Sequence, residues 1–307
     1  MNIITLLPSA TEIVAALGAT GQLRGISHSC DWPREVATLP RLTATAVDSL
    51  ATAGAIDAQV RSIVGTGAPL YTIDAEAIRA LRPDVIVTQA LCDVCAVSEG
   101  DVRALAAELS PPPTVVTLAG RTINGVLDDI RAVGAAIGAN DEALELIDGL
   151  LKRLTRVHET LTAARAPRPR VTVIEWTDPL FAAGHWVPEM VGKAGGVDVL
   201  ARAGEHSVVV TVEAVRAAAP EVLCVAPCGF NLAECVEAAR TLLARDEWAW
   251  ARSLEVWALD ANGMSSRPGP RLVSGVETMA AVMHPGLFPT PLMAHAMRVA
   301  WPPHRVE

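Results

Sequence analysis

The chain has 307 residues and a formal net charge of −9. This length exceeds the usual size of a single hydrophobic core, so we expect two domains. The charges are spread along the chain without a basic block, which argues against nucleic acid as a partner, and the longest apolar runs are strand-sized, which argues against insertion into a membrane.

The first half of the chain alternates apolar, strand-like runs with helical segments. A strand is expected from Ile3 to Leu7, and Pro8 then begins a helix for which Ser9 is the expected N-cap, with Glu12 three residues later. Further strands are expected at 23–26, 85–88 and 114–118, and further helices before residue 81, at about 100–109 and at about 123–137. Such alternation predicts a largely parallel sheet with helices on both faces.

A single long helix is expected in the middle of the chain. Apolar residues recur with a helical period from Asp141 to about Arg165, and the prolines that follow end the pattern. We therefore predict a first lobe at 1–140, a connecting helix at 141–166 and a second lobe at 167–307.

The second half restarts the alternation with a strand at 171–175. Its Pro220-Glu221-Val222, directly before an apolar run, repeats the Pro83-Asp84-Val85 of the first half. One such unit in each half supports two related lobes. The predicted fold is α/β, with two Rossmann-like lobes of mostly parallel sheets joined by one long α-helix.

Several motifs together resemble those of the helical-backbone, or class III, substrate-binding proteins of ABC importers. They are the run Leu6 to Glu12, the two Pro-acid-strand units, the single long helix and the segment Ser266 to Arg271. Within this class the chain looks most like the cobalamin and ferric-siderophore branch. The resemblance implies that the ligand, cobalamin or a related corrinoid, lies in a cleft between the two lobes, and that the protein's partner is an ABC permease.

Ligands of open parallel sheets gather beyond the carboxyl ends of the strands. The loops expected there carry most of the unusual side chains of this sequence, namely His28, Cys30, Gln89, Cys92, Cys95, Trp176, His185, Trp186 and Cys228. The two-residue gap between Cys92 and Cys95 lets both thiolates reach one metal ion. With His28 and Cys30 they would form a Cys₃His zinc site, or they would hold an iron–sulfur cluster closed by Cys228. The alternative is that Cys92 and Cys95 are small, partly buried residues of a turn.

Tryptophan accounts for seven of the aromatic residues, against one tyrosine and three phenylalanines. Indole offers a wide apolar face and one N–H donor, which suits a flat conjugated ligand. We expect Trp176 and Trp186, with the neighbouring His185, to contact the ligand, and the resemblance favours Trp186. Three other tryptophans are better explained by core packing, namely Trp248, Trp250 and Trp257.

Arg267 lies in a rigid segment between Ser266 and Pro268, where its guanidinium would donate hydrogen bonds to an amide, carboxylate or phosphate of a ligand. The alternative is a surface arginine that holds a carbonyl of its own loop. Gln89, at the expected end of a strand, is a further polar candidate for ligand binding.

The sequence contains no Gly-x-Ser-x-Gly, Walker-type or His-Glu-x-x-His motif, so we predict a binding protein and not an enzyme. The predicted function is binding of cobalamin or a related corrinoid for an ABC importer. The alternative is a cytosolic metal or iron–sulfur protein, with redox or enzymatic activity, that uses the same scaffold and its cysteines.

The amino-terminal residues lack the basic start and the apolar stretch of an export signal. We expect a cytoplasmic protein as the sequence stands, and a periplasmic or extracellular one if a natural signal has been removed.

Overall fold

The computed structural model describes residues 1–90, 97–289 and 294–301. Its contacts divide the chain into two compact units, of which unit 1 comprises 1–120 and 124–150, and unit 2 comprises 121–123 and 151–307. The division falls inside the long helix α6 (Asn140–Ala163), after Leu150. The prediction from the sequence instead treats 141–166 as a segment separate from both lobes.

Unit 1 is built on a parallel four-stranded sheet in the order β2-β1-β5-β6. The strands are β1 (Ile3–Thr5), β2 (Leu23–Gly25), β5 (Val85–Gln89) and β6 (Thr114–Leu118). The helices that alternate with them are α1 (Pro8–Ala16), α3 (Ala75–Leu81), α4 (Glu99–Glu108) and α5 (Ile123–Ile137). This alternation confirms the predicted α/β class.

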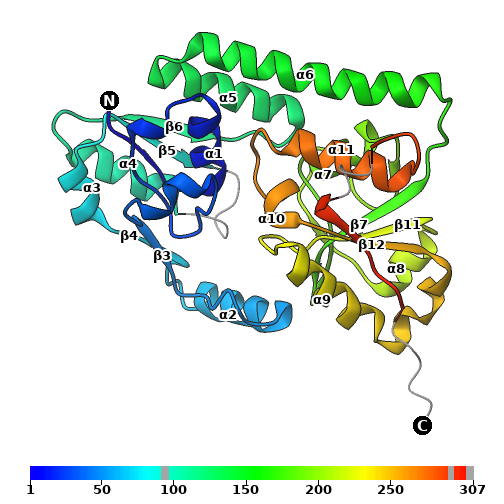
Figure 1. Ribbon diagram of the computed structural model, residues 1–307. Coiled ribbons are helices and arrows are strands. Elements are labelled where there is room, and N and C mark those ends of the chain that lie inside the picture. The colour runs from blue at the N-terminus through cyan, green and yellow to red at the C-terminus, as the bar shows by residue number, and fades with distance from the viewer. Residues whose placement is uncertain (91–96, 290–293, 302–307) are drawn as a thin grey trace. The chain divides into compact units, whose positions relative to one another are not determined.

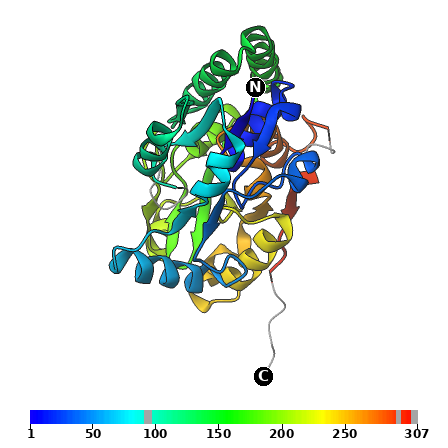
Figure 2. The same ribbon diagram turned by 90° about the vertical axis from the view of Figure 1, so that its left-hand side faces the viewer.

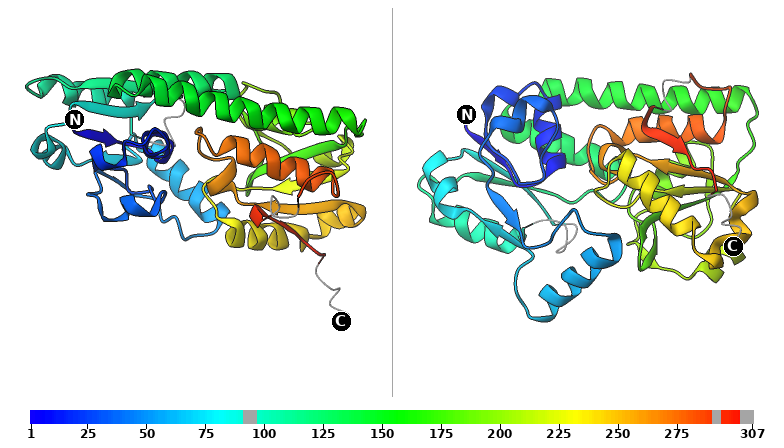
Figure 3. Two further views of the ribbon diagram at one scale, coloured as in Figure 1. Left: turned by 45° about the horizontal axis from the view of Figure 1, so that its top comes forward. Right: turned by 60° about the horizontal axis from the view of Figure 1, so that its bottom comes forward.

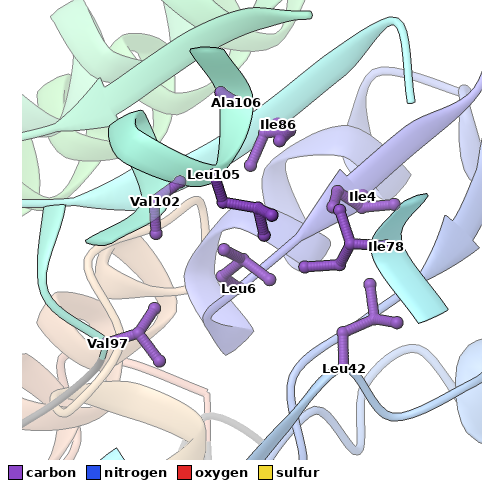
Figure 4. Close-up of a cluster of buried hydrophobic side chains, with 9 residues drawn as sticks. All are labelled: Ile4, Leu6, Leu42, Ile78, Ile86, Val97, Val102, Leu105 and Ala106. Carbon is purple, nitrogen blue, oxygen red and sulfur yellow. The ribbon is translucent and has the colours of Figure 1, made fainter. Parts of the chain in front are cut away.

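The core of unit 1 lies between one face of this sheet and helices α3 and α4 (Figure 4). Its side chains are Ile4, Leu6, Leu42, Ile78, Ile86, Val97, Val102, Leu105 and Ala106. Ile4 from β1 and Ile86 from β5 are paired neighbours in the sheet, and the side chains of α3 and α4 pack over them.

A two-stranded ribbon and one further helix in unit 1 were not predicted from the sequence. Strands β3 (Thr43–Thr45) and β4 (Tyr71–Ile73) pair antiparallel, and α2 (Ala53–Gly65) lies between them in the chain. Helix α2 stands apart from the four-stranded sheet (Figures 1 and 2), and none of its residues is buried. Thr52 caps it by accepting a hydrogen bond from the amide of Ala55.

Unit 2 contains a seven-stranded sheet in the order β10-β8-β7-β11-β12-β13, with β9 also paired to β7. Its strands are β7 (Arg170–Thr177), β8 (Leu180–Ala182), β9 (Val197–Asp198), β10 (Val208–Val209), β11 (Val222–Val225), β12 (Glu255–Leu259) and β13 (Ala296–Arg298). The central strands β7, β11 and β12 are parallel, whereas β8 and β13 pair antiparallel with β7 and β12, and β10 pairs antiparallel with β8.

Helices cover both faces of the unit 2 sheet (Figures 1 and 3). They are α7 (Val187–Lys193), α8 (Val212–Ala217), α9 (Leu232–Leu243), α10 (Ala261–Met264) and α11 (Leu272–Met283), with a 3₁₀ segment at Asp246–Ser253. Helices α7 and α11 lie on one face, and α9 lies on the other (Figure 3). In the described ranges, no helix is long and apolar enough to span a lipid bilayer.

The two Pro-acid-strand units have the same structural role in the two halves of the chain. In unit 1 the carboxylate of Asp84 accepts from the amide of Asn2 at 2.6 Å, just before β1. In unit 2 the carboxylate of Glu221 accepts from the amide of Arg170, at the start of β7, at 2.8 Å. In each unit the acid therefore ties the amino ends of two neighbouring parallel strands together.

The start of helix α1 differs from the prediction. The N-cap is Leu7 and not Ser9, and Pro8 occupies the first helical position. Proline is favoured there because its fixed φ suits the first turn and its missing N–H would have had no partner. Ser9 is therefore inside the helix, where it is buried.

Candidate functional site

Three loops meet at the carboxyl edge of the parallel strands in unit 2. The amide of Cys228, after β11, donates to the carbonyl of Glu175 in β7 at 3.0 Å. The amide of Gly229 donates to Oγ of Ser266, after β12, at 2.9 Å. The amide of Asn262 donates to the carbonyl of Phe230 at 2.8 Å. We call these segments, namely the end of β7 at 175–178, the loop at 226–230 and the segment at 260–267 that includes α10, the unit 2 edge.

An aromatic pair lies on the unit 2 edge. The rings of Trp176 and Phe230 are 5.7 Å apart in an edge-to-face arrangement, and both side chains are half-buried. The indole N–H of Trp176 donates to the carbonyl of Asp178 at 3.0 Å. Cys228 is exposed beside them. This partly open apolar surface can pack against one face of a flat ligand.

Trp186 has a different environment from the one expected for a ligand contact. It is 8% exposed, and its indole N–H donates to the carbonyl of Ser265 at 2.7 Å. The indole therefore holds the loop that carries Ser266 and Arg267 against the start of α7. Ser266 is half-buried, and Arg267 is 7% exposed.

Glu175, next to Trp176, holds the segment at 204–207 against β7. Its carboxylate accepts from the hydroxyl of Ser207 and from the amide of Gly184, the latter at 3.1 Å. Burial raises the pKa of Glu175, against the lowering effect of these two hydrogen bonds. A Cβ at Gly184 would collide with the backbone of Ser207, so only glycine permits this close approach.

His185 adopts a left-handed backbone conformation, with φ of 55°, which is uncommon for a residue other than glycine. Its amide donates to the carbonyl of Glu205 at 2.6 Å, and its carbonyl accepts from the amide of Gly204 at 2.8 Å. The imidazole packs edge-to-face on His206 with 5.1 Å between ring centroids. Burial lowers the pKa of His185, and the nearby His206 and Arg121 lower it further, so the ring is neutral at neutral pH.

In unit 1, His28 lies in the loop after β2. Its backbone amide donates to Oγ1 of Thr43 at 3.0 Å, and its ring Nδ1 is 2.7 Å from the same hydroxyl oxygen. The ring stacks on Tyr71 with centroids 5.6 Å apart. Burial lowers the pKa of His28, with a smaller contribution from the positive charge of Arg41. His28 therefore also carries a neutral imidazole at neutral pH.

Cys30 is part of a buried hydrogen-bond network in unit 1. Its sulfur lies 3.0 Å from the hydroxyl of Thr11 and 3.1 Å from the hydroxyl of Ser27, and the side chain is 1% exposed. Gln89, at the end of β5, is also buried.

The predicted metal site involves residues that the structure does not place. Cys92 and Cys95 lie outside the described residues. Within the described ranges, no three histidine, cysteine or acidic side chains come together in a way that could hold a metal ion. The zinc or iron–sulfur site stays a prediction from the sequence.

Three of the residues described above were not singled out from the sequence, namely Glu175, Phe230 and His206. A signal for two of them was present. Glu175 is an acid at the last position of the strand expected at 171–175, and Phe230 follows Cys228-Gly229 soon after another apolar run. His206 lies in a loop whose position beside His185 depends on the pairing of the short strands β8 and β10, which were not predicted from the sequence.

Comparison with known proteins gives consistent matches along most of the chain. A family model described as periplasmic binding protein matches residues 3–251. A vitamin B12-binding protein of Vibrio cholerae serotype O1 is 23% identical over 283 residues, which cover 92% of this chain and 88% of that protein.

Two solved structures share the fold. A periplasmic heme-binding protein from Pseudomonas aeruginosa superposes with a TM-score of 0.72 at 20% identity, covering 99% of each chain. The periplasmic vitamin B12-binding protein BtuF of Vibrio cholerae gives a TM-score of 0.64 at 22% identity, covering 92% of this chain and 96% of that one.

Proposed function

This chain belongs to the periplasmic binding protein family, whose members bind ligands without transforming them, and we propose that it is the substrate-binding component of an ABC importer for cobalamin or a related corrinoid. The proposal depends chiefly on one observation, the aromatic pair of Trp176 and Phe230 at the unit 2 edge, beside the polar loop that carries Ser266 and Arg267.

The chemistry of a corrinoid suits this edge. The ring presents a broad apolar face, which would pack on the half-buried rings of Trp176 and Phe230. The amide side chains around the ring would exchange hydrogen bonds with the half-buried Ser266 at this edge. A Vibrio cholerae relative named as a vitamin B12-binding protein, aligned over most of this chain, supports the same choice.

A calorimetric titration tests the proposal. Cyanocobalamin should bind the purified protein with one-to-one stoichiometry, and Trp176→Ala should weaken binding roughly tenfold, the effect typical of losing a central aromatic contact. Trp250→Phe is the matched control. Trp250 lies in the 3₁₀ segment that leads into the amino end of β12, at the opposite edge of the sheet, so this variant should bind normally.

Hemin is the competing ligand in the same titration, because a structural relative is named as a heme-binding protein. Binding of hemin with the same dependence on Trp176, in the absence of cyanocobalamin binding, would overturn the corrinoid assignment and retain the site. Binding of neither would overturn both.

The partner and the compartment follow from the same proposal. We expect an ABC permease to receive the ligand, and we expect the protein to act outside the cytoplasmic membrane, as the relatives named periplasmic do. Release of the protein from whole cells by osmotic shock checks the compartment, and its retention in the cytosol would contradict it.

The metal alternative has its own test. A Cys₃His zinc site or an iron–sulfur cluster using Cys92 and Cys95 requires stoichiometric zinc or iron in protein purified without oxygen. Elemental analysis of the ligand-free protein and of a Cys92→Ser variant distinguishes this alternative from corrinoid binding, which requires neither metal.

A further inference from the structure

Unit 2 contains a groove near the amino end of β7, at the opposite end of the parallel strands from the unit 2 edge. The groove has a volume of about 560 Å³ and lies between the second half of α6, the linker at 165–168 and the last turn of α7. That linker leads directly into the amino end of β7, whereas Trp176 is at the carboxyl end of the same strand. The groove is therefore separate from the proposed corrinoid site.

One wall of the groove is apolar. Leu151, Leu154 and Leu161 line it from one face of α6, at spacings of three and seven residues that keep them on the same side of a helix. Leu151 is 43% exposed, and Leu154 and Leu161 are half-buried. This row of side chains offers a hydrocarbon surface that is still in contact with water.

The other wall is basic. Arg165, Arg168 and Lys193 line the groove, and none of the described residues that line it is acidic, in a chain whose formal net charge is −9. Arg168 donates to the carbonyl of Gly196 at 2.9 Å, and the ammonium of Lys193 is 3.6 Å from a carboxylate oxygen of Glu189. Among the described residues, the Arg165 guanidinium has no hydrogen-bond or ion-pair partner.

We propose that this groove binds a soluble single-chain amphiphile with a carboxylate head group. The head would accept hydrogen bonds from the fork of Arg165 and lie close to the charge of Lys193, and the chain would cover Leu151, Leu154 and Leu161. A groove of this volume is in the range of sites for small molecules, whereas docking on a membrane would require a broad basic face.

Titration with laurate below its micellar concentration tests the proposal. We expect saturable binding to one site, weakened about tenfold or more in the double variant Arg165→Gln/Lys193→Gln, because hydrogen bonds to charged groups are the strong ones. The matched control is Arg156→Gln. Arg156 is exposed on the same helix but does not line the groove, so its loss should leave laurate affinity unchanged.

Two further measurements separate the contributions. Laurate affinity should fall with increasing salt, and dodecanol, which has the same chain without the charge, should bind much more weakly. A second variant, Leu154→Asn, should weaken laurate without removing a charge. Circular dichroism establishes that each variant is folded before its titration is interpreted.

Three outcomes would overturn the proposal. They are equal affinity of the wild type and the double variant for laurate, equal binding of dodecanol and laurate, and binding to vesicles of anionic phospholipid with no binding of monomeric laurate. Cyanocobalamin binding should be the same in the groove variants as in the wild type, so a failure of either proposal leaves the other testable.

Discussion

Asp198 carries a carboxylate whose two oxygens have unequal environments. One oxygen accepts from the amides of Leu200 and Ala201, at 3.0 and 2.9 Å, and the other is buried without a partner among the described residues. Burial raises the pKa of Asp198 to about 6. The pKa of Asp198 is therefore higher in the folded protein than in the unfolded chain. The contribution of this side chain to the free energy of unfolding is fully present below about pH 4 and is lost as the pH rises through about 6.

The substitution Asp198→Asn should therefore stabilise unit 2 at pH 8 by about 1–3 kcal/mol, since it removes the buried charge and keeps an oxygen to accept from both amides. The difference from the wild type should shrink below pH 6 and disappear near pH 4. Urea unfolding at several pH values measures it. Glu237→Gln, at an exposed carboxylate of α9, is the control, and a gain of Asp198→Asn that did not change with pH would disprove the explanation.

Trp186 provides a second test at a single residue. Its indole N–H donates to the buried carbonyl of Ser265, so Trp186→Phe should leave that carbonyl without its partner and cost about 1–3 kcal/mol of stability. Trp176→Ala, at a half-buried position, should cost less. Thermal unfolding of the two variants compares them. A negligible loss of stability for Trp186→Phe would mean that this hydrogen bond is not a principal support of the 265–267 loop.

These two tryptophans show what the sequence can predict at this scale. Both were candidates because each follows a strand or begins a helix, and an indole is equally suited to packing and to ligand contact. Which one stays accessible depends on the carbonyl of Ser265, a partner 79 residues away in the chain. Local patterns contain no information about such a contact, so the candidates were identified but their environments were not.

Helix α6 shows the same distinction for a whole element. Its helical period predicted it closely, as 141–165 against the observed Asn140–Ala163, because the apolar stripe is set by sequence spacing alone. Helix α2 has no buried residue and the antiparallel strands β8, β10 and β13 are only two or three residues long, so none of these elements produces a strong period. They were missed for that reason.

A polar contact joins α6 to α11 within unit 2. The guanidinium of Arg153 donates to both carboxylate oxygens of Glu277, at 3.0 and 2.5 Å, and to the hydroxyl of Ser274 at 2.8 Å. Because both side chains are largely shielded from water, Arg153→Ala should destabilise unit 2 by about 1.5–3 kcal/mol.

A double-mutant cycle of Arg153→Ala with Glu277→Ala measures the coupling directly, by urea unfolding. Arg156→Gln, on the exposed side of the same helix, should have almost no effect. A coupling energy near zero would show that the C-terminal half of α6 is held to α11 by its apolar side chains alone.

At the scale of the whole molecule, the tryptophans are distributed unequally between the two units. Trp32 is the one tryptophan of unit 1, and the other six, at 176, 186, 248, 250, 257 and 301, belong to unit 2. Intrinsic fluorescence therefore reports mainly on the unfolding of unit 2. Trp32→Phe should leave the fluorescence-detected transition of the ligand-free protein unchanged, and a shift in its midpoint would contradict this assignment.

Binding of a ligand to unit 2 can be detected as an increase in the thermal stability of that unit. A ligand that binds only the native state, at one hundred times its dissociation constant, stabilises that state by about 2.7 kcal/mol. For a unit of this size, cyanocobalamin should raise the Tm of the unit 2 transition by about 5–10 °C. Scanning calorimetry measures the shift without interference from the colour of the ligand.

In Trp176→Ala, at the same ligand concentration, the shift should be clearly smaller, because a tenfold weaker ligand stabilises by about 1.4 kcal/mol less. An equal shift in both proteins would place the ligand away from the unit 2 edge, even if binding itself were confirmed.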